Sequence, residues 1–222
     1  MYDSIIFDLD GTLWDAADAC SKGWNKALID CDLGHIAVSA NDIRGVSGLP
    51  FQECVSTMFS GVDGLDYQKL SEAIDREEMH HVSLFGGELY DGVVEGIVKL
   101  SEGFPLFLIS NCQSWYLESF WENHKMKHHF RDHDCHGNSG VSKSEMIKKM
   151  CREKSLGRTI YVGDTRGDQI SSREAGVEFA FAEYGFGKTS EPELSFSNFT
   201  ELTTKFLKWS QDANNQKLIQ EK

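Results

Sequence analysis

The sequence has 222 residues, of which 40% are hydrophobic, and a formal net charge of −13 at pH 7. This length suits one large domain, or a core domain that carries a smaller inserted one. The acidic balance argues against proteins that bind nucleic acid through a basic surface, so we expect no nucleic-acid partner. A phosphorylated substrate remains compatible with this charge, provided that a local cation neutralises the phosphate.

Three features of the sequence indicate the cellular compartment in which the protein works. No apolar run approaches the roughly 20 residues that a membrane-spanning helix requires, so we expect no membrane partner. The chain passes from Met1 directly towards a strand, without the pattern of a secretory signal. Its six cysteines show no C-x-x-C spacing, which favours reduced thiols used as small apolar side chains. We therefore expect a cytoplasmic protein, whose oligomeric state the sequence leaves open.

The first predicted strand, residues 5–9, leads into two carboxylates, Asp8 and Asp10, and is followed by Gly11. Keeping two acids this close both ionised costs free energy, and sharing a cation or a proton relieves that cost. The pattern therefore indicates a metal ion, or a nucleophile beside an acid/base. The alternative is an acidic turn that does no more than end a strand.

The next stretch, between Asp15 and Phe85, contains no convincing strand and is typical of helices. The expected helices cover residues 16–29, 40–46, 50–59 and 67–82. We therefore predict an all-helical cap domain at residues 15–85, inserted into a core domain that consists of residues 1–14 and 86–222. Residues 13–15 and Gly86-Gly87 would be the two hinges.

Beyond residue 86, strands and helices alternate. Strands are predicted at 105–111, 133–136, 159–164 and 177–182, with helices at 92–102, 114–127, 142–154 and 167–175. Three of the chain's strands are continuous apolar runs, as expected when both faces of a parallel sheet are covered. The sequence thus predicts an α/β fold, a doubly wound parallel sheet with the helical cap inserted after the first strand.

Polar residues follow these strands at the carboxyl ends, where open α/β sheets bind their ligands. They are Asp8 and Asp10 after the first strand, Ser110 and Asn111 after the second, Lys143 at the start of a helix, and Asp164 and Asp168 after the fourth strand.

Each of these residue types suits phosphoryl transfer. Asp8 could attack phosphorus, and Asp10 could protonate the leaving oxygen and then activate water. Carboxylates at 8 and 164, with a water held by Asp168, would form an all-oxygen site suited to Mg²⁺. Ser110, backbone N–H groups and Lys143 could hold the phosphate oxygens as charge spreads over them.

At these positions the chain resembles the haloacid dehalogenase (HAD) superfamily, and in particular its phosphatases with a helical cap. The resemblance lies in four motifs in the family's order: D-x-D-G-T at Asp8–Thr12, the serine Ser110, the lysine Lys143, and G-D-x-x-x-D at Gly163–Asp168. Residues 175–176 and 183–187 also resemble the phosphoglycolate phosphatase-like branch. The resemblance covers nearly the whole chain and implies a Rossmann-like core and a Mg²⁺-dependent phosphatase of small phosphorylated metabolites.

The resemblance also implies roles for individual residues. Asp8 would be the nucleophile and a metal ligand, and Asp10 the acid/base, whose backbone carbonyl also binds the metal. Asp164 would be a further metal ligand. Supporting positions would be Thr12, next to the acids, and Asp168, which would act through water or by orienting the lysine. The phosphate would be bound by Ser110, Asn111 and Lys143.

Two other functions remain open. One is a phosphomutase of the same fold, similar to β-phosphoglucomutase, although those enzymes often carry valine at the position of Thr12. The other is a non-catalytic binding protein, which would have no need for Asp10. The acid at position 10 also favours phosphate esters over C–Cl or C–P bonds, because relatives that cleave those bonds lack it.

Two further groups have alternative interpretations. In the cap, Arg44 or Gln52 could contact the leaving group of the substrate, because a glycine-flexed loop at residues 44–48 lies between two predicted cap helices. The alternative is an ordinary surface turn. His124 and His128 have the i, i+4 spacing of a transition-metal site, but a polar helix end is the favoured interpretation.

Overall fold

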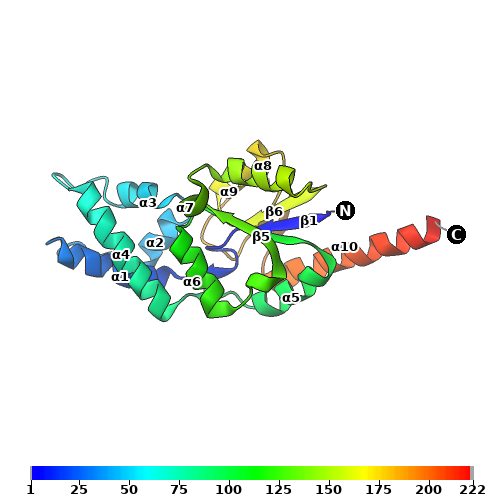
Figure 1. The fold of residues 1–222 in the computed structure, drawn as a ribbon, viewed down its shortest axis with the longest axis horizontal. Helices are drawn as coiled ribbons and strands as arrows, with labels where there is room; N and C mark the ends of the chain where they lie inside the picture. Colours follow the sequence, from blue (N-terminus) through cyan, green and yellow to red (C-terminus); the bar gives the residue numbers. More distant parts are fainter. Residues whose placement is uncertain (1, 221–222) are drawn as a thin grey trace.

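A six-stranded parallel sheet forms the centre of the structure, a computed structural model that describes residues 2–220 (Figure 1). Its order is β5 (Phe130–Cys135), β4 (Leu106–Ser110), β1 (Ser4–Phe7), β6 (Thr159–Gly163), β7 (Glu178–Ala182) and β8 (Leu194–Phe196). Every residue of β1, β4 and β6 is buried, which explains why these strands are continuous apolar runs. The predicted α/β fold with a doubly wound parallel sheet is confirmed.

Helices cover both faces of the sheet, because alternate strand residues point to opposite faces. Ile5 and Phe7 pack into one apolar core with α5 (Val93–Gly103) and α10 (Phe199–Gln220). Ile6 belongs to a second core with α8 (Lys143–Glu153). Two more helices complete the layers, α6 (Ser114–His124) and α9 (Arg166–Glu174). None of the helices in the described chain has both the length and the apolar character needed to cross a bilayer.

Four helices lie beyond the carboxyl end of β1, on the side opposite the N-terminus (Figure 1). They are α1 (Ala17–Asp30), α2 (Ala40–Val46), α3 (Phe51–Met58) and α4 (Tyr67–Phe85), as expected for this stretch. The chain enters and leaves this group through two short antiparallel strands, β2 (Trp14–Asp15) and β3 (Glu88–Leu89). The segments predicted as hinges therefore lie next to each other.

The group is held together by a close approach of α1 and α4 at Gly23. A Cβ atom at this position would lie 2.7 Å from Glu78 Cα and 2.8 Å from the Glu77 carbonyl oxygen. Glycine weakens a helix interior but lets the two backbones meet. On the same helix, Trp24 stacks on Phe59, with ring centroids 5.9 Å apart. The α1 side chains beside Gly23 are thereby placed against Glu78.

The structure differs from the sequence-based expectation in several segments. Strand β5 begins at Phe130 rather than 133, because Phe130 is buried and pairs with Leu106. Helix α6 ends at His124 rather than 127, because Lys125 takes the left-handed conformation with φ 55°. Unpredicted elements are β2, β3, β8, α10, the short helix α7 (His136–Ser139) and the 3₁₀ turn η1 (Lys127–His129).

Replacing Gly23 with alanine should lower the free energy of unfolding by about 1–3 kcal/mol, because the new methyl group would overlap backbone atoms of α4. This loss runs against intrinsic helix propensity, which favours alanine over glycine by about 1 kcal/mol. Urea denaturation followed by circular dichroism measures the change.

The matched control is Gly45→Ala in α2, where no atom lies within 4 Å of the Cβ position. This control should be neutral or stabilising. Equal stability of the two variants would contradict the tight packing of α1 against α4.

Candidate active site

Three aspartates converge at the carboxyl ends of β1 and β6. One carboxylate oxygen from each of Asp8, Asp164 and Asp168 lies within 4.8 Å of the others, and all three residues are buried. The neighbouring strands bring them together, and the Asp8 N–H extends the strand pairing by donating to the Val162 carbonyl oxygen at 2.8 Å. In the part of the chain that the structure describes, no other such group of acidic, cysteine or histidine side chains occurs.

Lys143 lies between two of these carboxylates. Its Nζ is 3.1 Å from Asp8 Oδ1 and 2.6 Å from Asp168 Oδ1, and all three side chains are about 2% exposed or less. Burial alone would lower the pKa of Lys143, but the charges of Asp168 and Asp8 outweigh it and hold this pKa above its usual value. The lysine therefore stays protonated and supplies a fixed positive charge beside Asp8.

Asp168 is itself held rigidly at the start of α9. Its Oδ2 accepts hydrogen bonds from the backbone N–H of Asp164 at 3.2 Å, from that of Thr165 at 3.0 Å and from Thr165 Oγ1 at 2.7 Å. Its other oxygen accepts from Lys143. Of the two roles that the resemblance implied for Asp168, this geometry favours orienting the lysine.

The negative charges of Asp8 and Asp164 are not fully compensated by neighbouring groups. Asp8 Oδ1 is buried and has no hydrogen bond of ordinary geometry, although the lysine ammonium is nearby. Burial, followed by the charge of Asp168, raises the pKa of Asp8 to about 6. Burial and the charges of Asp168 and Asp8 raise the pKa of Asp164 to about 8. A divalent cation would relieve this crowding, and carboxylate oxygens are the ligands that hard cations prefer.

Two glycines leave room for the Asp164 carboxylate. Gly11 has φ +76°, and a Cβ at this position would overlap the carboxylate of Asp164. A Cβ at Gly185 would overlap the same side chain. The carboxylate also accepts hydrogen bonds from the Phe186 N–H at 2.7 Å and from Thr12 Oγ1 at 3.4 Å. Thr12 thus contacts the cluster through Asp164.

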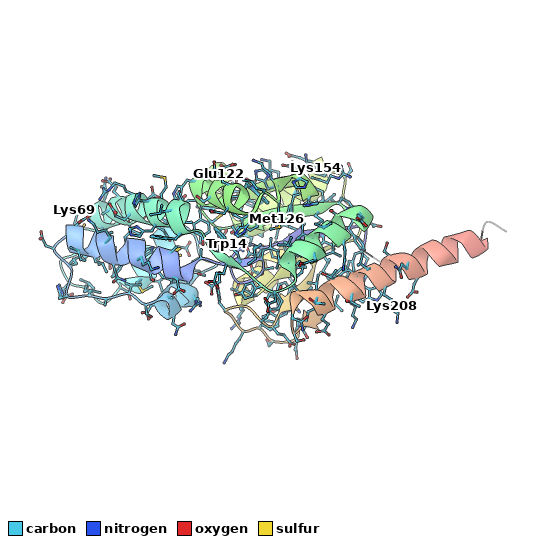
Figure 2. The ribbon with its side chains drawn as sticks, turned by 90° about the horizontal axis from the view of Figure 1, so that it is seen from below. Trp14, Lys69, Glu122, Met126, Lys154 and Lys208 are labelled. Carbon is cyan, nitrogen blue, oxygen red and sulfur yellow. The ribbon has the colours of Figure 1, made fainter. Side chains whose placement is uncertain are left out.

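Asp10 lies at the junction between the sheet and helices α1–α4. Its Oδ1 accepts hydrogen bonds from Tyr116 OH at 2.6 Å and from Trp14 Nε1 at 3.1 Å. Figure 2 shows Trp14 at this junction. Its side chain is fully buried and packs edge-on against Tyr116 and Phe120. Burial raises the pKa of Asp10 to about 7, although the Tyr116 hydrogen bond opposes the rise. A carboxyl group with this pKa can hold or release a proton near neutral pH.

Sequence reasoning missed both donors to Asp10, Trp14 and Tyr116. Tyr116 had a usable signal, because it lies in the first turns of the helix that follows the second strand end, where ligand-binding groups gather.

Ser110 and Asn111 lie at the end of β4 and line the same pocket as Asp8 and Asp10. Ser110 Oγ accepts a hydrogen bond from the Cys112 N–H at 3.3 Å. Asn111 Nδ2 donates to the Gly48 carbonyl oxygen at 2.7 Å, whereas its Oδ1 is buried without a partner. Asn111 therefore joins the strand end to the loop between α2 and α3.

The structure does not bring Arg44 or Gln52 to the pocket that contains Asp8. The Arg44 guanidinium pairs with Asp15 Oδ2 at 2.8 Å and donates to Asn41, which directs it into a neighbouring cavity. Gln52 lies on the exposed side of α3 in a separate groove, while the adjacent Phe51 faces the pocket. Among the described residues, His124 and His128 belong to no group of three or more side chains that could hold a metal ion, and the His124 ring packs against Trp14 and Phe120.

Curated proteins with known names are similar to this chain over most of its length. The chain is 26% identical to the phosphoglycolate phosphatase of Rhodobacter capsulatus over 195 residues, covering 85% of this chain and 88% of that protein. It is 24% identical to a 5'-nucleotidase of Pseudomonas aeruginosa over 204 residues, covering 87% of both.

Solved structures share the fold. A predicted phosphoglycolate phosphatase from Haemophilus somnus superposes with a TM-score of 0.78 at 19% identity, covering 92% of this chain and 98% of that one. The family model for haloacid dehalogenase-like hydrolases matches residues 5–182, from β1 to the end of β7. The chain therefore belongs to the haloacid dehalogenase-like hydrolase family.

Proposed function

We propose that this protein is a Mg²⁺-dependent phosphatase that hydrolyses a phosphate monoester of a small metabolite through a phosphorylated Asp8. The observation that carries the proposal is the buried placement of Asp8 between Lys143 and Asp164, with Asp10 held two residues away by Tyr116. The curated relatives are named as phosphatases or nucleotidases, which supports the same class of reaction.

The reaction follows from the positions of the two acids. An Asp8 oxygen forms a bond to phosphorus while the bond from phosphorus to the leaving oxygen breaks. Asp10 gives its proton to that oxygen, so the leaving group departs as a neutral alcohol. In the second step Asp10 takes a proton from a water molecule, whose oxygen attacks phosphorus. The bond between phosphorus and Asp8 then breaks and releases inorganic phosphate.

The charge of the phosphate requires positive groups near Asp8. Lys143 supplies one, and together with Ser110 it would hold phosphate oxygens. Asp8, the backbone carbonyl of Asp10 and Asp164 would hold Mg²⁺, which when bound neutralises carboxylate and phosphate charge. The buried charges of Asp8 and Asp164, which Lys143 compensates only in part, fit such an ion.

We also propose that helices α1–α4 act as a cap domain, residues 15–85, over a core domain of residues 1–14 and 86–222. The adjacent strands β2 and β3 support this division, because both connections cross at one place. A cap would exclude bulk water while Asp8 is being phosphorylated. The substrate would be a small soluble phosphoester, and the cytoplasmic location stays a prediction from the sequence.

Asp8→Asn should lower kcat for phosphate release by about a thousandfold or more, because the amide cannot form the phosphorylated intermediate. A phosphate-release screen over small phosphoesters measures the loss, with circular dichroism as the check on folding. The control is Asp30→Asn, which only removes an exposed ion pair with Lys26 on α1. A folded Asp8→Asn protein that keeps its activity would rule out this nucleophile, and transfer of phosphate to a second sugar phosphate instead of water would indicate a mutase.

Tyr116→Phe should reduce kcat by about 10- to 100-fold, because Asp10 loses a charge-assisted hydrogen bond that orients it. KM should change much less, since the phosphate-holding groups stay in place. The matched control is Tyr67→Phe, which removes the hydrogen bond that the Tyr67 hydroxyl donates to the Phe59 carbonyl oxygen. Tyr67 does not line the pocket that contains Asp10. Steady-state kinetics that respond equally to both substitutions would contradict a specific effect on Asp10.

Removal of divalent ions with a chelator should abolish phosphate release, and added Mg²⁺ should restore it. Asp164→Asn should raise the Mg²⁺ concentration needed for half-maximal activity by about 10-fold or more, because one anionic ligand is lost. Asp132→Asn is the control, because that carboxylate pairs with Lys154 on the surface of the sheet. Full activity in the presence of the chelator would exclude the metal from the proposal.

A further inference from the structure

The pocket that contains Asp8 continues into helices α1–α4, and its far end has no role in the chemistry described above. Its walls there are mostly apolar and aromatic, formed by Trp24, Ile43, Phe51 and Trp115, with one carboxyl group, Glu78. Among the described residues that line this pocket, none is a lysine, an arginine or a histidine. The cavity volume of the whole pocket, from Asp8 to Glu78, is about 70 Å³, several times what one water molecule needs, so the pocket suits only a small substrate.

Glu78 is unusual for a buried acid because no cation compensates it. It lies on α4 opposite Gly23 and is 8% exposed. Burial raises its pKa to about 7, the Cys20 thiol and the Trp24 indole oppose this rise, and the charge of Asp75 adds to it. No positive side chain contributes among the groups that act on it. An uncompensated buried carboxylate is destabilising, and a cationic ligand would offset that cost.

Two tryptophans line this end of the pocket together with Glu78. The Trp24 side chain is only 2% exposed, and its indole N–H is the group that helps to hold down the pKa of the Glu78 carboxyl. Trp115 is fixed by a hydrogen bond from its Nε1 to Asp75 at 2.9 Å. Tryptophan rings next to a carboxylate are a favourable environment for an ammonium group. A carboxylate in the same place would meet Glu78 and no positive side chain.

We propose that this end of the pocket selects phosphate esters of small amino alcohols, with the ammonium group against Glu78 and the rings of Trp24 and Trp115. This inference rests on the proposed phosphatase function and adds its substrate class. Esters whose leaving group carries a carboxylate are disfavoured, because they would place like charges together in a buried space. Phosphoglycolate is such an ester, so this chain would differ in selectivity from the relatives named for it.

Three esters with two-carbon leaving groups test the inference. They are 2-aminoethyl phosphate, neutral ethyl phosphate and phosphoglycolate, compared by kcat/KM for phosphate release from the full-length wild-type protein with Mg²⁺. The 2-aminoethyl ester should exceed ethyl phosphate by about 10-fold or more, and phosphoglycolate should fall below ethyl phosphate. Equal values for the three, or a preference for phosphoglycolate, would overturn the inference while leaving the phosphatase proposal intact.

Glu78→Gln connects the selectivity to this side chain. The isosteric amide should reduce the ratio of kcat/KM between the 2-aminoethyl and ethyl esters by about 10-fold. Glu77→Gln is the matched control, because the preceding glutamate pairs with Arg76 outside the pocket, and it should keep the wild-type ratio. An unchanged ratio in folded Glu78→Gln protein would contradict the assignment, and if this variant does not fold the wild-type ratios alone decide.

A binding measurement tests the inference separately from the phosphatase proposal. If the wild-type protein hydrolyses none of the three esters, calorimetric titration of Asp8→Asn protein with 2-aminoethyl phosphate and with ethyl phosphate decides the inference. Tighter binding of the 2-aminoethyl ester that is lost with Glu78→Gln supports it. Equal binding of the two esters overturns it.

Discussion

The site depends on the charge balance around Lys143, whose ammonium group lies between the buried carboxylates of Asp8 and Asp168. Removing either kind of partner would leave an uncompensated charge in a buried space, which is far more costly than the loss of an exposed ion pair. One lysine does not balance the negative charge of this site, because the end of β6 adds a third carboxylate, that of Asp164. The site is therefore ready to accept further positive charge.

Helix starts hold this arrangement in position. Ser142 caps α8 and forms a reciprocal pair of hydrogen bonds with Glu145, so the following lysine leaves the backbone in a defined direction. Thr165 caps α9 in the same way, with Asp168 as its partner. The Asp168 carboxylate thus takes part in the cap of α9 and also orients Lys143.

The sequence was sufficient for five of the six strands of the sheet and for the residues at their ends, because apolar runs mark buried strands and a parallel sheet gathers their carboxyl ends. It did not reveal β8. It was insufficient for residues that enter through helix packing. Tyr116 and Glu78 reach the pocket only because of how α6 and α4 are turned, and one helical sequence does not specify that rotation. The guanidinium of Arg44 was diverted by Asp15, which is 29 positions away. Helix α10 also escaped prediction, although its buried side chains have helical spacing: Phe199, Leu202 and Phe206.

The hydrogen bond from Asn111 to the Gly48 carbonyl oxygen has a consequence for how the pocket opens. It joins the loop between α2 and α3 to the strand end that also carries Ser110, so separation of the helices from the sheet must break it. A neutral hydrogen bond of this kind contributes only about 0.5–1.5 kcal/mol net. Thermal fluctuations can break a hydrogen bond of this strength, so product could leave without the binding of another molecule. Asn111 follows Ser110 directly, so a phosphate held by Ser110 would lie close to this hydrogen bond and could shift the balance between open and closed arrangements.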